Sequence, residues 1–95
     1  MKLVEKKKDK SNIIIAVEGE MTIYSARELL TGLYKYLDKI KNTELDLSKV
    51  TKIDTSGFQL LSMARKEVEG KDKTFKIVNP SSDVTRIFKL YGENL

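Results

Sequence analysis

The chain has 95 residues and a net charge of +4, with 40% hydrophobic and 34% charged residues. This size and apolar content predict one small folded domain over residues 1–95, and they exclude a disordered chain. The absence of cysteine and histidine excludes disulfides, ordinary zinc sites and a Ser-His-Asp catalytic triad.

The N-terminal segment predicts a β-hairpin. Residues 1–8 are compatible with an edge strand, Asp9–Asn12 has the composition of a turn, and Ile13–Val17 is typical of a buried strand that ends at Glu18-Gly19. Because Ile13–Val17 is the longest purely apolar run, no segment is long enough to span a bilayer. The basic N-terminus is not followed by an apolar segment of signal-peptide type. We therefore expect a cytoplasmic protein without membrane insertion.

The hairpin also carries a cluster of lysines at positions 6, 7, 8 and 10. A nucleic-acid surface is one interpretation of such a cluster. No aromatic residues are interleaved with these lysines to stack on bases, so we favour a charged edge strand whose lysines discourage edge-to-edge pairing.

A first helix is predicted after the hairpin. Its apolar stripe recurs at three- and four-residue spacing and comprises Ala26, Leu29, Leu30, Leu33, Leu37 and Ile40. Either Thr22 or Ser25 could cap its N-terminus, and Glu28 stands at capping-box spacing from Ser25. The alternation in Glu44–Leu47 then predicts a short strand, with Val50 and Ile53 in the loop that follows it.

A second helix is expected over Ser56–Glu69, with Gly70 placed to end it. Phe75–Val78 predicts another strand, and Asn79–Asp83 has turn and cap chemistry. Val84, Ile87, Phe88 and Tyr91 form the stripe of a third helix that stops at Gly92. The residues Glu93–Leu95 fit either the start of a further strand or a tail.

The resulting order is β-β-α-β-α-β-α, which places the chain in the α/β class. Alternating strands and helices predict parallel strands joined by right-handed crossovers, and the hairpin makes the sheet mixed. We expect about four strands with the helices packed mainly on one face, because the chain is too small to cover both faces.

The loop Lys52–Gly57 is the main candidate site. It joins a strand to the second helix, which is where ligands gather in open α/β sheets. Asp54, Thr55 or Ser56 could cap the helix, with Gly57 allowing a tight turn. The same position favours a phosphate, because a helix N-terminus has free N–H groups and a positive dipole end. The residues alone leave both interpretations open.

Catalysis by this loop is disfavoured. Its hydroxyls have no histidine to activate them, and nothing in the sequence indicates that Lys52 is buried and able to act as a base. The phosphate-binding patterns G-x-x-x-x-G-K-S/T and G-x-G-x-x-G are absent. We expect a protein that is not an enzyme and that holds no metal and no cofactor.

Three stretches together resemble the STAS family, named for sulfate transporters and anti-sigma factor antagonists. They are GEMTIYSA, LDLSKVTKIDTSGFQLL and KTFKIVNPSSDVTRIFKLYG, so the resemblance covers roughly Ile13–Gly92. The motif Asp-(Ser/Thr)-(Ser/Thr/Ala)-Gly is matched by Asp54–Gly57. The resemblance implies a STAS fold with the element order predicted above.

The resemblance also implies a regulatory role. Single-domain STAS proteins of this kind are bacterial regulators of transcription. When unphosphorylated they bind an anti-sigma factor that is also a serine/threonine kinase, and a phosphatase reverses the phosphorylation. The residue directly after the aspartate is the one modified, which is Thr55 here, and Ser56 is the second choice.

A partner surface is expected around this site. A phosphate adds charge and bulk that a docked partner would meet directly. The residues expected to contribute are Thr22, Tyr24, Phe58, Gln59, Ser62, Met63 and Lys66. For any one position on the exposed side of the second helix, an ordinary solvated face is the alternative.

The sequence departs from the sporulation and stress type of antagonist at Thr22, where those proteins usually carry an aspartate. TIYSA and DTSGFQLL look more like STAS proteins found beside chemotaxis and two-component signalling genes. Two alternatives therefore stay open. One is a non-phosphorylated interaction subunit of a chemotaxis or lipid-transport complex, and the other is a nucleotide- or anion-binding STAS module. Direct nucleic-acid binding ranks last.

Overall fold

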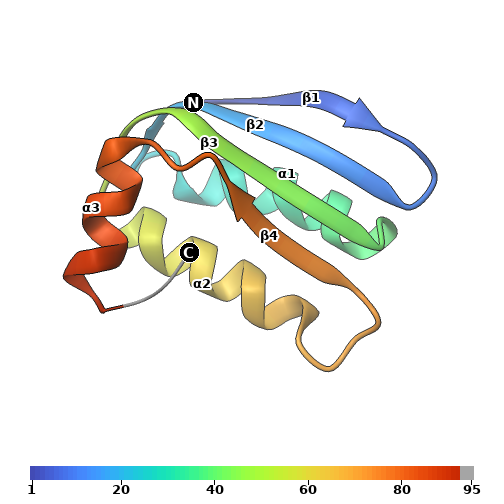
Figure 1. Ribbon diagram of the computed structural model, residues 1–95. Coiled ribbons are helices and arrows are strands. Elements are labelled where there is room, and N and C mark those ends of the chain that lie inside the picture. The colour runs from blue at the N-terminus through green and yellow to red at the C-terminus, as the bar shows by residue number, and fades with distance from the viewer. Residues whose placement is uncertain (93–95) are drawn as a thin grey trace.

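The computed structural model describes residues 1–92, and Glu93–Leu95 lie outside the described residues (Figure 1). Four strands and three helices follow one another in the predicted order β-β-α-β-α-β-α. They are β1 (Lys2–Lys8), β2 (Asn12–Met21), α1 (Ala26–Lys39), β3 (Asn42–Ile53), α2 (Thr55–Val68), β4 (Thr74–Val78) and α3 (Ser82–Leu90).

The strands form one mixed sheet in the order β1-β2-β3-β4. β1 is antiparallel to β2, whereas β2, β3 and β4 run parallel, as the hairpin and the crossover helices predict. Figure 1 shows α1 and α2 side by side beneath the sheet, with α3 across the end of the sheet at which β3 stops. The backbone N–H of Ser81 donates to the Leu47 O in the middle of β3 at 3.2 Å and ties the start of α3 to that strand.

The core lies between the sheet and its helices. Ile13, Ile15 and Val17 alternate along β2 toward the helices and are almost completely buried, as are Leu29 and Leu33 of α1. The same alternation turns charged residues to the opposite face. There the strand registers place Lys7, Ile14, Glu44 and Lys76 in one row across the four strands. One apolar face and one charged face explain why the helices collect on one side.

Two strands are longer than the sequence predicted. β2 continues through Gly19, whose φ is +99°, as far as Met21, and β3 runs to Ile53 instead of ending near Leu47. Val50 and Ile53 are both buried although they are three residues apart, which simple alternation does not allow. Register shifts in the β2–β3 pairing make this spacing compatible with a strand.

The helix starts differ in detail from the sequence prediction. α2 begins at Thr55, one residue early, and Asp54 is its N-cap. Ser25 occupies the N-cap position of α1, one of the two predicted alternatives, but its side chain makes no cap bond, so no capping box with Glu28 forms. Its Oγ instead accepts from Thr22 N–H at 3.0 Å and donates to Glu20 O at 2.8 Å. The hydroxyl is therefore committed to the turn that precedes the helix.

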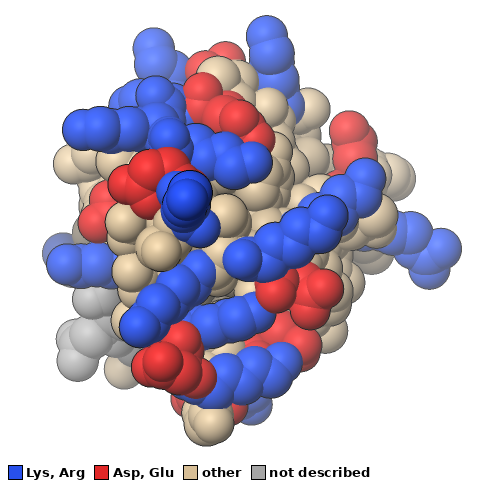
Figure 2. All heavy atoms as spheres, turned by 90° about the vertical axis from the view of Figure 1, so that its right-hand side faces the viewer, with Lys and Arg blue, Asp and Glu red and all other residues tan. Residues whose placement is uncertain are grey.

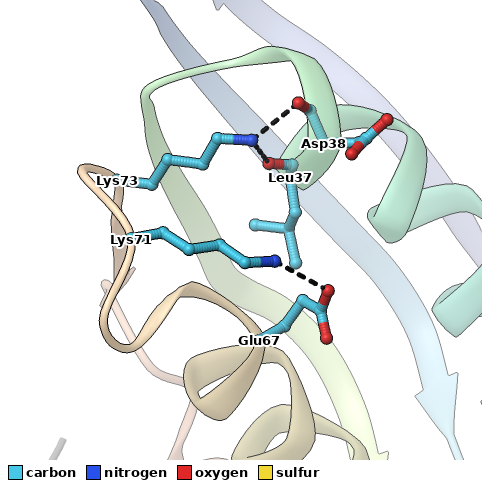
Figure 3. Close-up of polar contacts among 5 residues, drawn as sticks. All are labelled: Leu37, Asp38, Glu67, Lys71 and Lys73. Carbon is cyan, nitrogen blue, oxygen red and sulfur yellow. Dashed lines mark hydrogen bonds and ion pairs between the residues drawn. The ribbon is translucent and has the colours of Figure 1, made fainter.

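Lysines gather at the end of the molecule that contains the β1–β2 turn, where acidic side chains lie between them (Figure 2). Lys6, Lys7 and Lys8 are exposed along the edge strand β1, as the edge-strand interpretation predicted. At the same end, Lys73 Nζ donates to the carbonyl oxygens of Leu37 and Asp38 at 2.7 and 2.6 Å (Figure 3). This basic end lies opposite the start of α2 (Figure 1).

Candidate functional site

Asp54 joins the two loops that the sequence singled out. Its Oδ1 accepts from Gly57 N–H at 3.1 Å, while its Oδ2 accepts from Ile23 N–H at 3.2 Å. The backbone N–H of Asp54 also donates to Met21 O at 3.3 Å. One carboxylate therefore caps α2 and ties the segment after β2 to the segment after β3.

Gly57 allows this close approach. A Cβ atom at this position would lie 2.4 Å from Met21 O and 2.8 Å from Ile53 Cγ1. Neither neighbour is the free end of a long side chain, so any larger residue would push α2 away from β2 and β3. The glycine of the motif is thus explained by packing.

Thr55 is exposed at the first position of α2, and its hydroxyl contacts α3. Thr55 Oγ1 lies 2.7 Å from the hydroxyl oxygen of Tyr91, a distance at which either group can donate. The Tyr91 ring stacks on Phe58 with centroids 4.6 Å apart and planes 17° apart. Phe58 in turn packs edge-on against Phe88. An aromatic cluster therefore holds the Tyr91 hydroxyl beside Thr55.

Ser56 points elsewhere. It is half-buried and borders a shallow groove of about 180 Å³ between α1 and α2. Gln59 and Met63 line the same groove from α2, and Arg27 lines it from α1. The two adjacent hydroxyls therefore face different neighbours, with Thr55 toward α3 and Ser56 toward α1.

The predicted partner residues divide by exposure. Tyr24 is 96% exposed and Met63 is 50% exposed, and Gln59 and Lys66 are also exposed. Thr22 and Ser62 are half-buried. Phe58 is only 7% exposed and belongs to the core. Phe58 therefore supports this surface from beneath and does not offer a contact of its own.

Several large apolar side chains are exposed on the segments that border the motif. The large hydrophobic residues exposed within residues 1–92 are Ile23, Tyr24, Met63, Leu90 and Tyr91. Ile23 and Tyr24 follow β2 beside Asp54, Met63 lines the Ser56 groove, and Leu90 adjoins Tyr91. We call these five residues the apolar patch. Large apolar side chains exposed on a small protein are candidates for contact with a partner.

The charged groups beside the motif have structural partners. Asp83 Oδ2 accepts from Ile53 N–H at 2.9 Å, at the end of β3. Hydrogen bonds from the Arg86 guanidinium and from that N–H lower the pKa of Asp83 below its ordinary value. Lys52 is exposed, so the burial that a lysine base needs is not provided. Within residues 1–92, no group of three acidic, histidine or cysteine side chains is arranged to hold a metal.

Tyr91, Ile23 and Leu90 were missed by the sequence analysis as site residues. Tyr91 was assigned to the apolar stripe of α3, and its hydroxyl meets a residue 36 positions away. The only sequence signal was the phenol at the end of that stripe. Ile23 and Leu90 carried no signal, because an isolated apolar residue is ordinary on a protein surface.

None of the helices in residues 1–92 is long and apolar enough to cross a membrane. Several solved structures share the fold. An anti-sigma factor antagonist from Mycobacterium paratuberculosis is 23% identical and superposes with a TM-score of 0.81, over 96% of this chain and 77% of that one. A STAS-domain antagonist from Rhodobacter sphaeroides is 22% identical, with a TM-score of 0.68 over 82% and 85% of the two chains.

The phosphorylated form of the Bacillus cell fate determinant SpoIIAA is 16% identical, with a TM-score of 0.73 over 96% of this chain and 84% of that one. At these identities the likeness establishes the fold. Residues 4–94 match the family model described as "Mlab, STAS domain". The element order, the sheet and this match together show that the chain belongs to the STAS family.

Proposed function

We propose that this protein is an anti-sigma factor antagonist controlled by phosphorylation of Thr55. In its unphosphorylated form it binds an anti-sigma factor that is also a serine/threonine kinase, and it is released when Thr55 is modified. It acts in the cytoplasm as the substrate of a kinase and a phosphatase, with no catalytic activity of its own. The observation that carries the proposal is an exposed Thr55 whose hydroxyl contacts Tyr91 of the apolar patch.

The proposed partner surface consists of the apolar patch together with Thr22, Gln59, Ser62 and Lys66. This combination of apolar and polar side chains suits a protein interface. The nearby groove of about 180 Å³ is smaller than a usual small-molecule pocket, so it favours a protein partner over a nucleotide. That an antagonist of this fold, SpoIIAA, has a phosphorylated form supports the proposed modification.

The reaction itself needs nothing from this chain beyond the hydroxyl. Thr55 Oγ would form a bond to the γ-phosphorus of ATP, the bond from that phosphorus to the ADP oxygen would break, and the hydroxyl proton would pass to a base of the kinase. The product carries close to two negative charges beside Tyr91 of the apolar patch. An interaction loss of about 3 kcal/mol there would weaken partner affinity more than a hundredfold.

The first test is intact-mass analysis and phosphopeptide mapping of the protein from its native cells, under several growth conditions. Trypsin releases residues 53–65 as one peptide that contains Thr55, Ser56 and Ser62, so fragmentation must localise the phosphate. We expect it on Thr55, lost in Thr55→Ala and retained in Ser56→Ala. A protein that stays unmodified in every condition contradicts the switch.

The second test is partner binding. Thr55→Ala should still capture a partner that transfers phosphate from ATP to wild-type Thr55, whereas Thr55→Glu should bind it at least tenfold more weakly. Ser56→Glu is the matched control, because Ser56 faces the groove between α1 and α2. Equal binding by all three variants would remove the switch.

A second candidate function is a constitutive interaction subunit. The Thr55 hydroxyl already has a structural partner in Tyr91, which would suit a residue that is never modified. In that case Thr55→Glu would leave partner binding unchanged, while Tyr24→Ala or Met63→Ala would weaken it. The mapping experiment therefore separates the two functions.

A further inference from the structure

We infer that Tyr91 is the residue that distinguishes the phosphorylated from the unphosphorylated form of Thr55. This inference rests on the proposed function, because it concerns how the fold responds to a phosphate on that hydroxyl. It makes Tyr91 a positioning residue for the modified side chain, and it gives a structural reason for Thr55 to be the regulated residue in preference to Ser56.

The geometry fixes the phenol in place. Tyr91 ends α3, where its N–H donates to Ile87 O at 3.2 Å, and its ring is stacked on Phe58. The backbone and the ring of Tyr91 are therefore both anchored, and the phenol oxygen lies 2.7 Å from Thr55 Oγ1. A side chain that is 45% exposed and yet anchored in this way is well placed to meet any group added to that oxygen.

Phosphorylation changes which of the two oxygens can donate a hydrogen bond. In the unmodified protein both carry a proton, and either can donate to the other. Once Oγ is esterified it has no proton, so the phenol becomes the only donor of the pair. Phosphoryl oxygens are strong charged acceptors, and the phenol would turn its proton to one of them in a charge-assisted hydrogen bond.

The same response is not available to Ser56. That side chain borders the groove lined by Arg27, Gln59 and Met63, on the side of α2 that faces α1. A phosphate on Ser56 would therefore not be received by Tyr91. Because Tyr91 is itself part of the apolar patch, a phosphate on Thr55 would change a residue of the proposed docking surface directly.

The test uses full-length protein with phosphothreonine incorporated at position 55, or phosphoserine at position 56, each in wild-type and Tyr91→Phe backgrounds. Tyr91→Phe keeps the ring and removes only the hydroxyl. Phosphorus NMR then measures the second pKa of each phosphate, which is near 6 in a free phosphoamino acid. A hydrogen bond to the dianion lowers that pKa.

We expect the proton affinity of the phosphate at Thr55 to be about threefold to tenfold lower in the wild-type background than in the Tyr91→Phe background, the range expected for one hydrogen bond. The second pKa of the phosphate at position 56 should be the same in both backgrounds. Tyr24→Phe is the matched control, because Tyr24 also belongs to the apolar patch and is 96% exposed. Thermal unfolding checks that each variant is folded.

An unchanged pKa at position 55 in the Tyr91→Phe background would overturn the inference. An equal shift at both positions would also overturn it, because the effect would then not distinguish Thr55. Since the phosphate is installed synthetically, neither result depends on a kinase. A cell that never modifies Thr55 would instead refute the proposed function and leave this measurement as it stands.

Discussion

At the scale of single residues, the motif Asp54–Gly57 is explained mostly by packing and hydrogen bonding. The Asp54 carboxylate accepts hydrogen bonds from the backbone N–H groups of Ile23 and Gly57. Gly57 lets α2 approach the ends of β2 and β3. The other two members of the motif, Thr55 and Ser56, carry hydroxyls that lie at or near the surface. Asp54 and Gly57 therefore fix the start of α2, from which the Thr55 hydroxyl meets Tyr91 and Ser56 borders the groove beside α1.

Gly57→Ala tests the packing role. A methyl group would meet the Met21 carbonyl at 2.4 Å, so we expect a loss of about 2 kcal/mol or more in the free energy of unfolding, measured by urea denaturation. Gly32→Ala is the matched control, since its methyl would meet only the flexible end of Leu3 at 2.6 Å. Gly32→Ala should stay within about 1 kcal/mol of wild type, because alanine favours the helix. Equal losses in the two variants would contradict the crowding at Gly57.

At the scale of elements, the ends of the helices are held by residues distant in sequence. Asp54 caps the N-terminus of α2. At the C-terminus of α1, the Lys73 ammonium donates to the carbonyls of Leu37 and Asp38 (Figure 3). Helix C-termini leave carbonyls without partners and favour a positive charge. Lys73 meets both needs while linking the loop before β4 to α1.

Lys73→Ala should therefore destabilise the protein by about 1 kcal/mol in urea denaturation, with its effect reduced at high salt. Lys71 provides the comparison. It lies two residues away, and its ammonium pairs at 3.1 Å with the exposed carboxylate of Glu67, four residues earlier in the chain. Lys71→Ala should cost at most about 0.5 kcal/mol. A Lys73 variant no less stable than the Lys71 variant would show that the carbonyl contacts contribute little.

At the scale of the whole molecule, one ion pair crosses the helix-free face of the sheet. Lys6 Nζ, at the irregularity in β1, reaches Asp46 Oδ2 on β3 at 2.9 Å, although β2 lies between these strands. The Asp46 side chain is 4% exposed. Burial alone would raise the pKa of Asp46, but hydrogen bonds from Ser48, Lys6 and Asn79 outweigh it and lower the pKa to about 2.

This shift makes stability depend on pH. The folded pKa lies below the ordinary 3.8, so the contribution is present above about pH 4 and is lost as the pH falls toward 2. The difference in unfolding free energy between wild type and Asp46→Asn should therefore shrink by about 2 kcal/mol between pH 7 and pH 2. Urea denaturation at several pH values measures it. A difference that does not vary with pH would contradict the charged contacts of Asp46.

Lys6→Gln should lower the free energy of unfolding at pH 7, because it removes one of the hydrogen bonds that stabilise the charged form of Asp46. Lys7→Gln is the matched control, because the ion pairs found within residues 1–92 include Lys6 and do not include Lys7. The Lys7 variant should have the same free energy of unfolding as wild type at pH 7. Comparable destabilisation in both variants would point to a general effect of net charge.

Sequence patterns alone predicted the element order, the mixed sheet, the position of the Asp54–Gly57 motif at a strand-to-helix junction and the family. Each of these follows from hydrophobic periodicity, turn residues or short motifs within one continuous segment. The length of β2 and β3, the burial of Phe58 and the contact between Thr55 and Tyr91 became visible only in the folded structure. Strand register and contacts between segments more than 30 residues apart depend on how the whole core packs, so no local pattern encodes them.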